Sequence, residues 1–579
     1  MTNSEIARIL YEISEYLEME DIAFKPRAFE KAGIVIENLE EDISEIYKKE
    51  GLKGLEKIPS IGKGIGEIIE DLIKTNKSKY YENLKKKTPV KLGELIAVEE
   101  VGPKMIKKLY KNLGIKNLKD LEKAAKAGKI RNLEDFGIKS EQNILQGIEF
   151  LRKSGGRFIL GFIMPDIRKI KQRIRGFPGV RKVVAAGSIR RMKETIGDGD
   201  LLVTVSSPKA AKKVSDFFIN MPEVAHVYTH GPTKSSIRLR NNMELDLRVV
   251  PEESFGAALQ YFTGSKSHNI ALRKIAMKKG LKLNEYGLFR GKNQIAGRTE
   301  EEIYKKLGLE YIEPELRTDT GEIKAALRQA QGKPSGLPKL IGYNDLKGDL
   351  QMHTTWSDGA NSIESIAQEA MKLGLEYIAI TDHTKSLPVA GGLNEKELLK
   401  HGKEIDKINK KLKGFKILKG AEVEVLKDGR LDIKDEVLKG LDVVGIAVHS
   451  NFKMPKEQMT ERIIKAMKNP NADILFHPTG RLINQRPPYQ LDMEKIIRVA
   501  KETKTVLEIN ARAERLDLKD EYARMAKEAG VKLSINSDSH NISHFQYLEF
   551  GIAQARRGWV EKKDVINAWP VEKMLKFLK

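Results

Sequence analysis

The sequence predicts a multidomain protein with a helical N-terminal region, a mixed α+β centre and a C-terminal α/β domain. Three observations support this fold class. First, 579 residues are too many for one hydrophobic core. Second, the spacing of apolar residues changes along the chain from helical to strand-like, and then to strands alternating with helices. Third, Gln331 to Gly342 is rich in glycine and proline and is the best linker candidate.

The composition indicates a folded, basic protein with an anionic partner. Hydrophobic residues make up 40% of the chain, charged residues 32%, and the net charge is +22. Such a surplus is typical of nucleic-acid binding, although a generally basic proteome would also produce it. Cysteine is absent, so any metal must be held by His, Asp, Glu and water.

We expect no membrane segment, because no stretch approaches about 18 consecutive apolar residues. Residues 1–21 form an acidic amphipathic helix rather than a signal peptide. The expected location is therefore the cytoplasm, and the expected state is a monomer.

The helical region, residues 1 to about 150, contains two related glycine turns. "IPSIGKGIGEIIEDLI" (Ile58 to Ile73) carries Gly62 and Gly64, and "VEEVGPKMIKKLY" (Val98 to Tyr110) carries Gly102 and Lys104. Turns of this kind direct backbone N–H groups outward from a helix N-terminus and can hold a nucleic-acid phosphate. A plain helix–helix turn is the alternative for each. We place one helix-hairpin-helix in residues 1–85 and the other in 86–150.

Residues 151–250 change to a strand pattern, seen in "VRKVVAAGS", "DLLVTVSS", "SSIRLR" and "MELDLRVV". Asp198 and Asp200 are two residues apart, so they share one face of a strand, and Asp246 lies on another strand. Three such acids need cations, and two divalent ions roughly 3.5–4 Å apart are typical of phosphoryl transfer. "DGD" alone is most often a turn. Ser188 and Arg191 just before it are suited to triphosphate oxygens.

Beyond the linker, strands and helices alternate through residues 342–579, which favours a parallel sheet or barrel. The apolar runs include "YIAITDH", "LDVVGIAVHS" and "ADILFHP", and nearly every run ends in His, Asp, Glu or Asn. In parallel α/β folds the ligand site lies at the C-terminal ends of the strands. We therefore expect one shared site there.

Five of the ten histidines occur at these strand ends, together with three acids and one amide. The candidate metal ligands are Gln351, His353, Asp358, His383, Glu422, His449, His477, Asp538 and His540. Imidazole with carboxylate suits Mn, Zn or Fe, and such a cluster predicts phosphoester hydrolysis. Arg481 is either a phosphate contact or a surface salt bridge. His226, His230, His268, His401 and His544 receive no metal role, although His268 is a candidate DNA contact and His544 is expected in a loop.

"GSIRRMKETIGDGD", "LDLRV", "YFTGSKSHNIALR" and "LNEYGLF" resemble, in order and spacing, the signature series of family X DNA polymerases. The resemblance covers residues 1–317 and implies a nucleotidyltransferase palm at 151–250 and a thumb at 251–317. It implies that Asp198, Asp200 and Asp246 are catalytic ligands of two Mg²⁺ or Mn²⁺ ions. The implied dNTP-binding residues are Gly187, Ser188, Arg191, Gly197, Tyr261, Phe262, Thr263, Gly264, Asn269 and Arg273.

The C-terminal pattern resembles the PHP (polymerase and histidinol phosphatase) domain over residues 342–579, with residues 318–341 as the linker. That resemblance implies a distorted (βα)7 barrel with up to three Mn, Zn or Fe ions. It also implies Mn-dependent 3′–5′ exonuclease activity and, in some members, abasic-site cleavage. Gln351 stands where the family has the first histidine of an HxH pair, so we expect it to be a weaker ligand. The combination is that of the PolX enzymes.

One departure concerns the 5′-deoxyribose-phosphate lyase activity of some family X polymerases. The Schiff-base lysine of those enzymes corresponds to Ile68, and Lys63, Lys74 and Lys77 are nearby but out of register. We therefore expect little lyase activity.

The leading hypothesis is a repair enzyme that fills short gaps and trims 3′ ends, acting on gapped or primer–template DNA with dNTPs. A monovalent cation at the hairpins is a further expected cofactor. The second hypothesis keeps the polymerase but makes the PHP domain a non-nucleolytic module that positions DNA. The third is a small-phosphomonoester hydrolase with a vestigial polymerase, which the intact three-acid set argues against.

Overall fold

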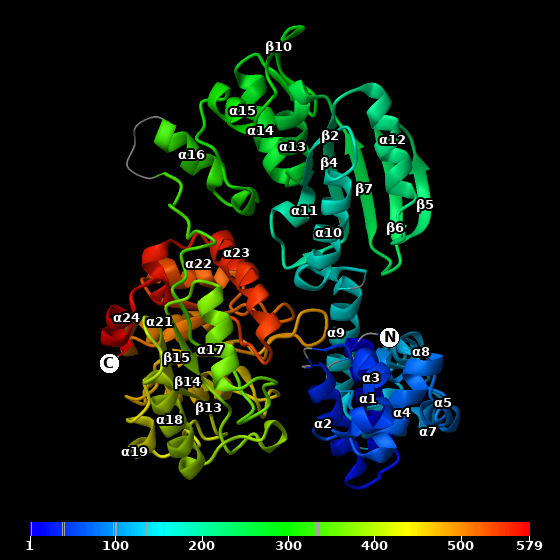
Figure 1. Cartoon of the computed structure of the whole chain (residues 1–579), viewed down its shortest axis with the longest axis vertical. Helices are drawn as coiled ribbons and strands as arrows, with labels where there is room; N and C mark the ends of the chain where they lie inside the picture. The colour runs from blue at the N-terminus through cyan, green and yellow to red at the C-terminus, as the bar shows by residue number, and fades with distance from the viewer. Residues whose placement is uncertain are drawn as a thin grey trace.

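The computed structural model describes residues 1–578 except 2, 38, 40, 97, 99–100, 135, 155 and 331–335. In Figure 1 the helical N-terminal unit (blue to cyan) and the C-terminal barrel (yellow-green to red) lie side by side, with the palm and thumb (blue-green to green) above them. Residues 331–335 of the predicted linker and Glu99 and Glu100 of the second hairpin lie outside the described residues.

The N-terminal region is helical, as predicted. Its first hairpin joins α3 (Ile43–Glu56) to α4 (Lys63–Thr75), and its second joins α6 (Leu92–Ile96) to α7 (Pro103–Leu113). Gly62 and Gly102 are the N-cap residues of α4 and α7. The other helices are α1 (Asn3–Met19), α2 (Lys25–Glu37), α5 (Lys79–Lys87), α8 (Leu118–Lys126) and α9 (Ile138–Ser154).

The palm is a five-stranded sheet in the order β2-β4-β7-β6-β5. The predicted strands are β2 (Val180–Ala185), β4 (Asp198–Val205), β6 (Lys234–Leu239) and β7 (Glu244–Val249). The fifth strand, β5 (Val224–His230), was not predicted, because this edge strand is largely exposed and lacks a buried alternation. A small sheet pairs β1 (Phe158–Ile159) with β3 (Thr195–Ile196), and the helices are α10 (Leu160–Arg175), α11 (Gly187–Arg190) and α12 (Pro208–Ile219).

The thumb mixes helices with a three-stranded antiparallel sheet. It contains α13 (Phe255–Thr263), α14 (Lys266–Lys278), β8 (Lys282–Asn284), β9 (Gly287–Arg290), β10 (Asn293–Ala296) and α15 (Glu300–Lys306). Part of the predicted linker is instead helix α16 (Glu322–Ala330), which begins with the buried Glu322. The Glu322 carboxylate lies 2.8 Å from Nδ1 of the buried His268, so α16 is tied to α14.

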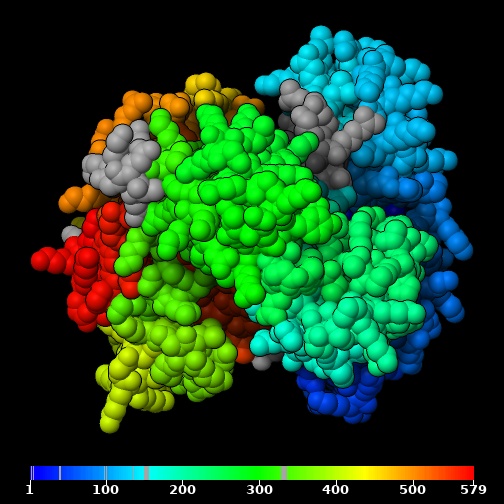
Figure 2. All heavy atoms as spheres, turned by 90° about the horizontal axis from the view of Figure 1, so that it is seen from above, coloured from blue at the N-terminus to red at the C-terminus, as the bar shows by residue number. Residues whose placement is uncertain are grey.

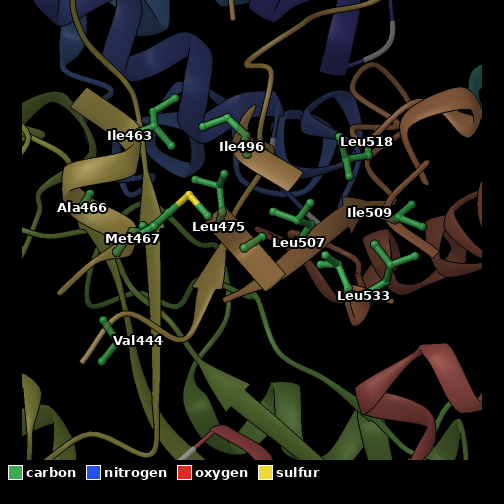
Figure 3. Close-up of a cluster of buried hydrophobic side chains, with 14 of the residues drawn as sticks. Val444, Ile463, Ala466, Met467, Leu475, Ile496, Leu507, Ile509, Leu518 and Leu533 are labelled. Atoms are coloured by element: carbon green, nitrogen blue, oxygen red, sulfur yellow. The ribbon is translucent and has the colours of Figure 1, made fainter. Parts of the chain in front are cut away.

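The C-terminal domain is a nearly closed barrel of seven parallel strands in sequence order. The strands are β11 (Gly348–Asp349), β12 (Tyr377–Ile380), β13 (Lys416–Glu424), β14 (Val443–Ala447), β15 (Ile474–Leu475), β16 (Val506–Asn510) and β17 (Leu533–Asn536). The covering helices are α17 (Ile363–Lys372), α18 (Glu395–Asn409), α19 (Asp435–Leu438), α20 (Lys456–Met467), α21 (Met493–Thr503), α22 (Asp520–Ala529), α23 (Leu548–Arg557) and α24 (Val571–Leu578). Figure 3 shows Leu475 and Leu507 among side chains that pack helices onto these strands.

The palm and barrel touch directly. Gly161 at the start of α10 faces Ala513 of the barrel so closely that an added Cβ would lie 2.6 Å from the alanine Cβ. Arg168 of α10 pairs with Glu549 of α23 at 2.5 Å. In Figure 2 the thumb atoms (green) adjoin both the palm (blue-green) and the barrel (red to yellow-green). Among the described residues, no helix is both long and apolar enough to cross a bilayer.

Candidate active sites

The three predicted polymerase carboxylates lie on two neighbouring interior strands of the palm sheet, β4 and β7. The parallel register of β4 and β7 sets Asp200 directly opposite Asp246, and Asp198 precedes Asp200 by two residues. Burial, Asp198 and Asp246 together raise the pKa of Asp200 to about 6. The Asp246 carboxylate lies 3.5 Å from the Lys234 amine and 3.4 Å from the Arg248 guanidinium. Negative charge is thus concentrated here, as a divalent-cation site requires.

A cavity of about 650 Å³ opens beside these carboxylates. It is lined by Asp198 and by nine of the ten predicted dNTP-binding residues: Gly187, Ser188, Arg191, Gly197, Tyr261, Phe262, Gly264, Asn269 and Arg273. Thr263 is fully buried instead, where its hydroxyl accepts a hydrogen bond from Arg190 at 2.8 Å. Arg157 and Lys266 also line the cavity and were missed. Lys266 lies within the motif "YFTGSKSHNIALR", but Arg157 lies in no motif that could have indicated a role.

Gly187 has a structural reason to be glycine. Its φ is +60°, and a Cβ there would lie 2.8 Å from Oδ2 of Asp200. Only glycine therefore lets the first residue of α11 approach the Asp200 carboxylate so closely. The carbonyl of Thr263 accepts a hydrogen bond from Arg191 and holds its guanidinium at the cavity.

The barrel strand ends converge as the sequence predicts. Donor atoms within 4.8 Å of one another form three groups: His353, Asp358, His383 and His540; His383, Glu422 and His449; and His353, Glu422 and Asp538. His477 joins them, since its Nε2 lies 2.7 Å from Oε1 of Glu422. Elements far apart in the sequence thus supply one cluster.

The cluster fits divalent metal ions. Both ring nitrogens of His353 and Nδ1 of His383 are buried and form no hydrogen bond within the described part of the chain. Burial and the neighbouring imidazole of His353 lower the pKa of His383 to about 3, which leaves its ring neutral. Against the effect of burial, His383 and His477 hold the pKa of Glu422 well below its ordinary value. Imidazoles together with ionised carboxylates are the donor set of Zn, Mn and Fe sites.

Gln351 lies inside this cluster, but both ends of its side-chain amide are hydrogen-bonded to protein groups and are not free to bind a metal ion. Its side chain is fully buried, its amide nitrogen donates to Glu422 at 3.1 Å, and its amide oxygen accepts from Asn510 at 3.1 Å. The amide oxygen is therefore already engaged. This geometry favours Gln351 as a support for Glu422 over the predicted weak ligand.

Supporting carboxylates around the cluster were missed. Glu424 lies 2.9 Å from Nδ1 of His449, and Glu508 accepts a hydrogen bond from the backbone N–H of His477. Partners of this kind orient metal-binding histidines. Both acids were visible as acidic residues inside apolar strands, "GAEVEV" and "TVLEINA".

Arg481 does not line the cavity at the histidine cluster, and its interpretation as a phosphate contact is corrected. Its guanidinium pairs with Glu194 of the palm at 2.7 Å and donates to the carbonyls of Arg515 and Leu516. Three acceptors hold it at the palm–barrel interface. Arg512 and Arg515, which were missed, line the cavity instead.

The remaining histidines lie outside the three groups. His268 and His401 are buried, the first between Glu322 and Tyr304 and the second 3.2 Å from Asp382. His544 is in a short 3-10 helix (Ile542–Tyr547) rather than a loop, and its Nδ1 accepts from the His540 N–H at 3.3 Å. His226 and His230 are on the exposed strand β5.

Neither the backbone conformation nor the packing requires glycine at the hairpin positions. Gly62 and Gly102 have φ of −83° and −80°, which any residue can adopt. A Cβ at Gly62, Gly64 or Gly102 would meet nothing within 4 Å in the described part of the chain. The surface at the start of α4 and α7 is therefore open at these glycines.

Comparison with known families agrees with this layout. The helix-hairpin-helix domain matches residues 1–78, the SAM-like helix-hairpin-helix tandem 92–149, the DNA polymerase beta thumb 258–318 and the PHP domain 349–512. A probable phosphatase of Thermoanaerobacter sp. (strain X514) is 34% identical over 242 residues, which are 40% of this chain and 94% of that protein.

A second relative resembles the whole molecule. The DNA polymerase/3′-5′ exonuclease PolX of Bacillus subtilis (strain 168) is 38% identical over 587 residues, covering 100% of both chains. Because this similarity includes the palm, the thumb and the barrel together, the chain belongs to the PolX family.

Proposed function

We propose that this protein is a template-directed DNA polymerase that fills short gaps during repair, with a PHP domain that is a metal-dependent 3′–5′ exonuclease. The observation that carries the polymerase activity is the register of β4 and β7, which sets Asp200 opposite Asp246 beside a cavity lined by Ser188 and Arg191. The B. subtilis relative is named for both activities.

In the polymerase site, Ser188 and Arg191 bind triphosphate oxygens, and Tyr261 and Phe262 line the sugar pocket. Asn269 and Arg273 lie on α14 beside the nascent base pair. Two Mg²⁺ or Mn²⁺ ions held by Asp198, Asp200 and Asp246 would neutralise phosphate charge and activate the primer hydroxyl.

In the barrel, His353, Asp358, His383, Glu422, His449, His477, Asp538 and His540 hold up to three Mn, Zn or Fe ions. These ions would polarise the phosphodiester and supply the attacking oxygen. Glu424 orients His449, and Gln351 orients Glu422. The same groups suit abasic-site cleavage, which is also phosphodiester hydrolysis.

The substrates are gapped or primer–template DNA and dNTPs, bound by a cytoplasmic monomer. The open space over Gly62, Gly64 and Gly102 supports close approach of a DNA phosphate to the backbone N–H groups, with Lys104 exposed beside it. A monovalent cation between backbone carbonyls and phosphate would strengthen this contact.

A second candidate is a barrel that only positions DNA. The observation in its favour is Gln351, which replaces one imidazole of the cluster by an amide with both ends hydrogen-bonded. Primer shortening by the wild-type protein is expected of an exonuclease barrel and not of a barrel that only positions DNA.

The test uses a 5′-labelled primer on one-nucleotide-gapped DNA with Mn²⁺, with and without dNTPs. We expect Asp200→Ala to lose extension by about a hundredfold or more and still shorten the primer. His353→Ala should do the opposite, so each variant is the folding control for the other. A wild-type protein that never shortens the primer would support the positioning module.

A further inference from the structure

A second cavity adjoins the histidine cluster. It has a volume of about 460 Å³ and lies between α10 of the palm and the 3-10 helix Ile542–Tyr547 of the barrel. We call it the aromatic crevice; Phe162, Pro165, Arg512, His544 and Tyr547 are among its lining residues. The cavity at the cluster is also lined by Arg512 and Glu37, so the two cavities lie on either side of these residues.

The crevice presents aromatic rings to solvent. Phe162 is 50% exposed, although the residues around it on α10 are buried in the palm core. The rings of His544 and Tyr547 lie 5.3 Å apart on the opposite wall. An exposed phenylalanine contributes little to folding, and flat rings beside a polar site are suited to stacking.

The spacing of the two walls is set by the palm–barrel contact. Gly161 packs against Ala513, and a Cβ at Gly161 would lie only 2.6 Å from the Ala513 Cβ. Phe162 follows Gly161 in the sequence, and Arg512 precedes Ala513. This close contact fixes Phe162 of one domain beside Arg512 of the other. Glu37 of α2 faces the same space, so the N-terminal unit forms a further wall.

Positive charge lies where the crevice meets the cluster. Nη1 of Arg512 is 3.5 Å from Nδ1 of His540, and Nε of Arg515 is 3.5 Å from Oδ2 of Asp538. Arg512 is also paired with Glu514 in the crevice. Guanidinium groups next to phosphoesterase ligands suit the phosphates of a bound strand.

We propose that the aromatic crevice binds the single-stranded 3′ end of DNA and leads it to the histidine cluster. Bases upstream of the scissile phosphate stack on Phe162, and Arg512 contacts the phosphate that follows. A volume of about 460 Å³ has the size of a small-molecule pocket and suits single nucleotides rather than a duplex. The proposal rests on the exonuclease function proposed above.

The test compares a 20-nucleotide single strand with thymidine 5′-p-nitrophenyl phosphate, a diester that carries no base upstream of its scissile phosphate, both with Mn²⁺ and the full-length protein. Phe162→Ala should raise KM for the 20-mer about tenfold, because stacking of one base is lost. Its kcat, its hydrolysis of the small diester and its gap filling should stay within twofold of wild type. Phe162→Trp should restore KM, and Phe162→Leu should not.

Leu399→Ala is the matched control, because Leu399 is 58% exposed on α18 and lines neither cavity. A KM for Phe162→Ala within twofold of wild type on the 20-mer would refute the crevice as the binding site. If Phe162→Ala also loses activity on the small diester, the crevice proposal is refuted too. Phe162 would then affect the histidine cluster itself and not the binding of the strand. A wild-type protein that cleaves neither substrate would refute the exonuclease function, and the crevice proposal with it.

Discussion

At the residue scale, Gln351 is the position where this chain departs from the histidine pair of its family. The structure gives the amide two hydrogen bonds, one to Glu422 and one from Asn510, in a fully buried place. A buried carboxylate that bridges several imidazoles must be held in one orientation to bind metal well. Gln351 therefore serves the cluster through Glu422.

Replacing Gln351 tests this role. Gln351→Ala removes the donor to Glu422 and should raise the Mn²⁺ concentration needed for half-maximal exonuclease activity by about 10–100-fold. Gln351→His should keep or lower that concentration, because an imidazole can itself bind the ion. The measurement is primer shortening across a Mn²⁺ series. A Gln351→Ala enzyme that responds to Mn²⁺ like wild type would exclude the role, as would loss of activity in Gln351→His.

At the element scale, helix α4 combines an open N-terminus with a closed interior. The space over Gly62 and Gly64 is free, whereas Ile68 is 8% exposed and packs in the N-terminal core. The helix therefore exposes backbone N–H donors at its N-terminus, whereas the later position 68 holds a buried isoleucine and not a reactive amine. Lys74 lies near its end, where its amine donates to Glu70 at 2.8 Å.

This arrangement predicts little lyase activity. A Schiff base needs a neutral amine, and the hydrogen bond and charge of Glu70 hold the pKa of Lys74 above its ordinary value. Borohydride trapping on 5′-deoxyribose-phosphate DNA should give a low yield that does not change in a Lys74→Ala, Lys77→Ala double variant. Strong trapping that this double variant abolishes would contradict the prediction.

At the scale of the whole molecule, the palm and barrel are joined at a place that concerns both sites. Glu194 lies in the sequence between Arg191 and Asp198, which both line the palm cavity, and it pairs with Arg481 of the barrel. Arg481 in turn binds the carbonyl of Arg515, which lines the cavity at the histidine cluster. One side chain therefore connects the loops of both candidate active sites.

Removing this connection should cost stability rather than phosphate affinity. Arg481→Ala leaves the largely buried Glu194 without its ion-pair partner and should destabilise the fold by about 1–3 kcal/mol, seen as a lower melting temperature. The double variant Arg481→Met, Glu194→Gln should recover part of the loss. If the Arg481→Ala protein melts like wild type but has a higher exonuclease KM, the result would support Arg481 as a phosphate contact instead.

Much of the fold followed from local patterns. The alternation of apolar runs and helices in residues 342–579 predicted a parallel sheet or barrel, and the resemblance to the PHP domain selected the barrel. Asp198 and Asp200 share one strand face because side chains alternate with a period of two. Strand β5 was missed because nearly all of it is exposed. The start of α16 was assigned to the linker because its buried partner, His268, lies 54 residues earlier.

The sequence by itself determined the candidate residues for the chemistry, because the three acids, the glycine turns and the strand-end histidines stand in local motifs whose spacing is dictated by the backbone. Only the tertiary structure decided their partners. It placed Gln351 on Glu422, Arg481 on Glu194, and Phe162 beside Arg512. The physical reason is that contacts between residues hundreds of positions apart depend on how whole elements pack, and no local periodicity encodes that packing.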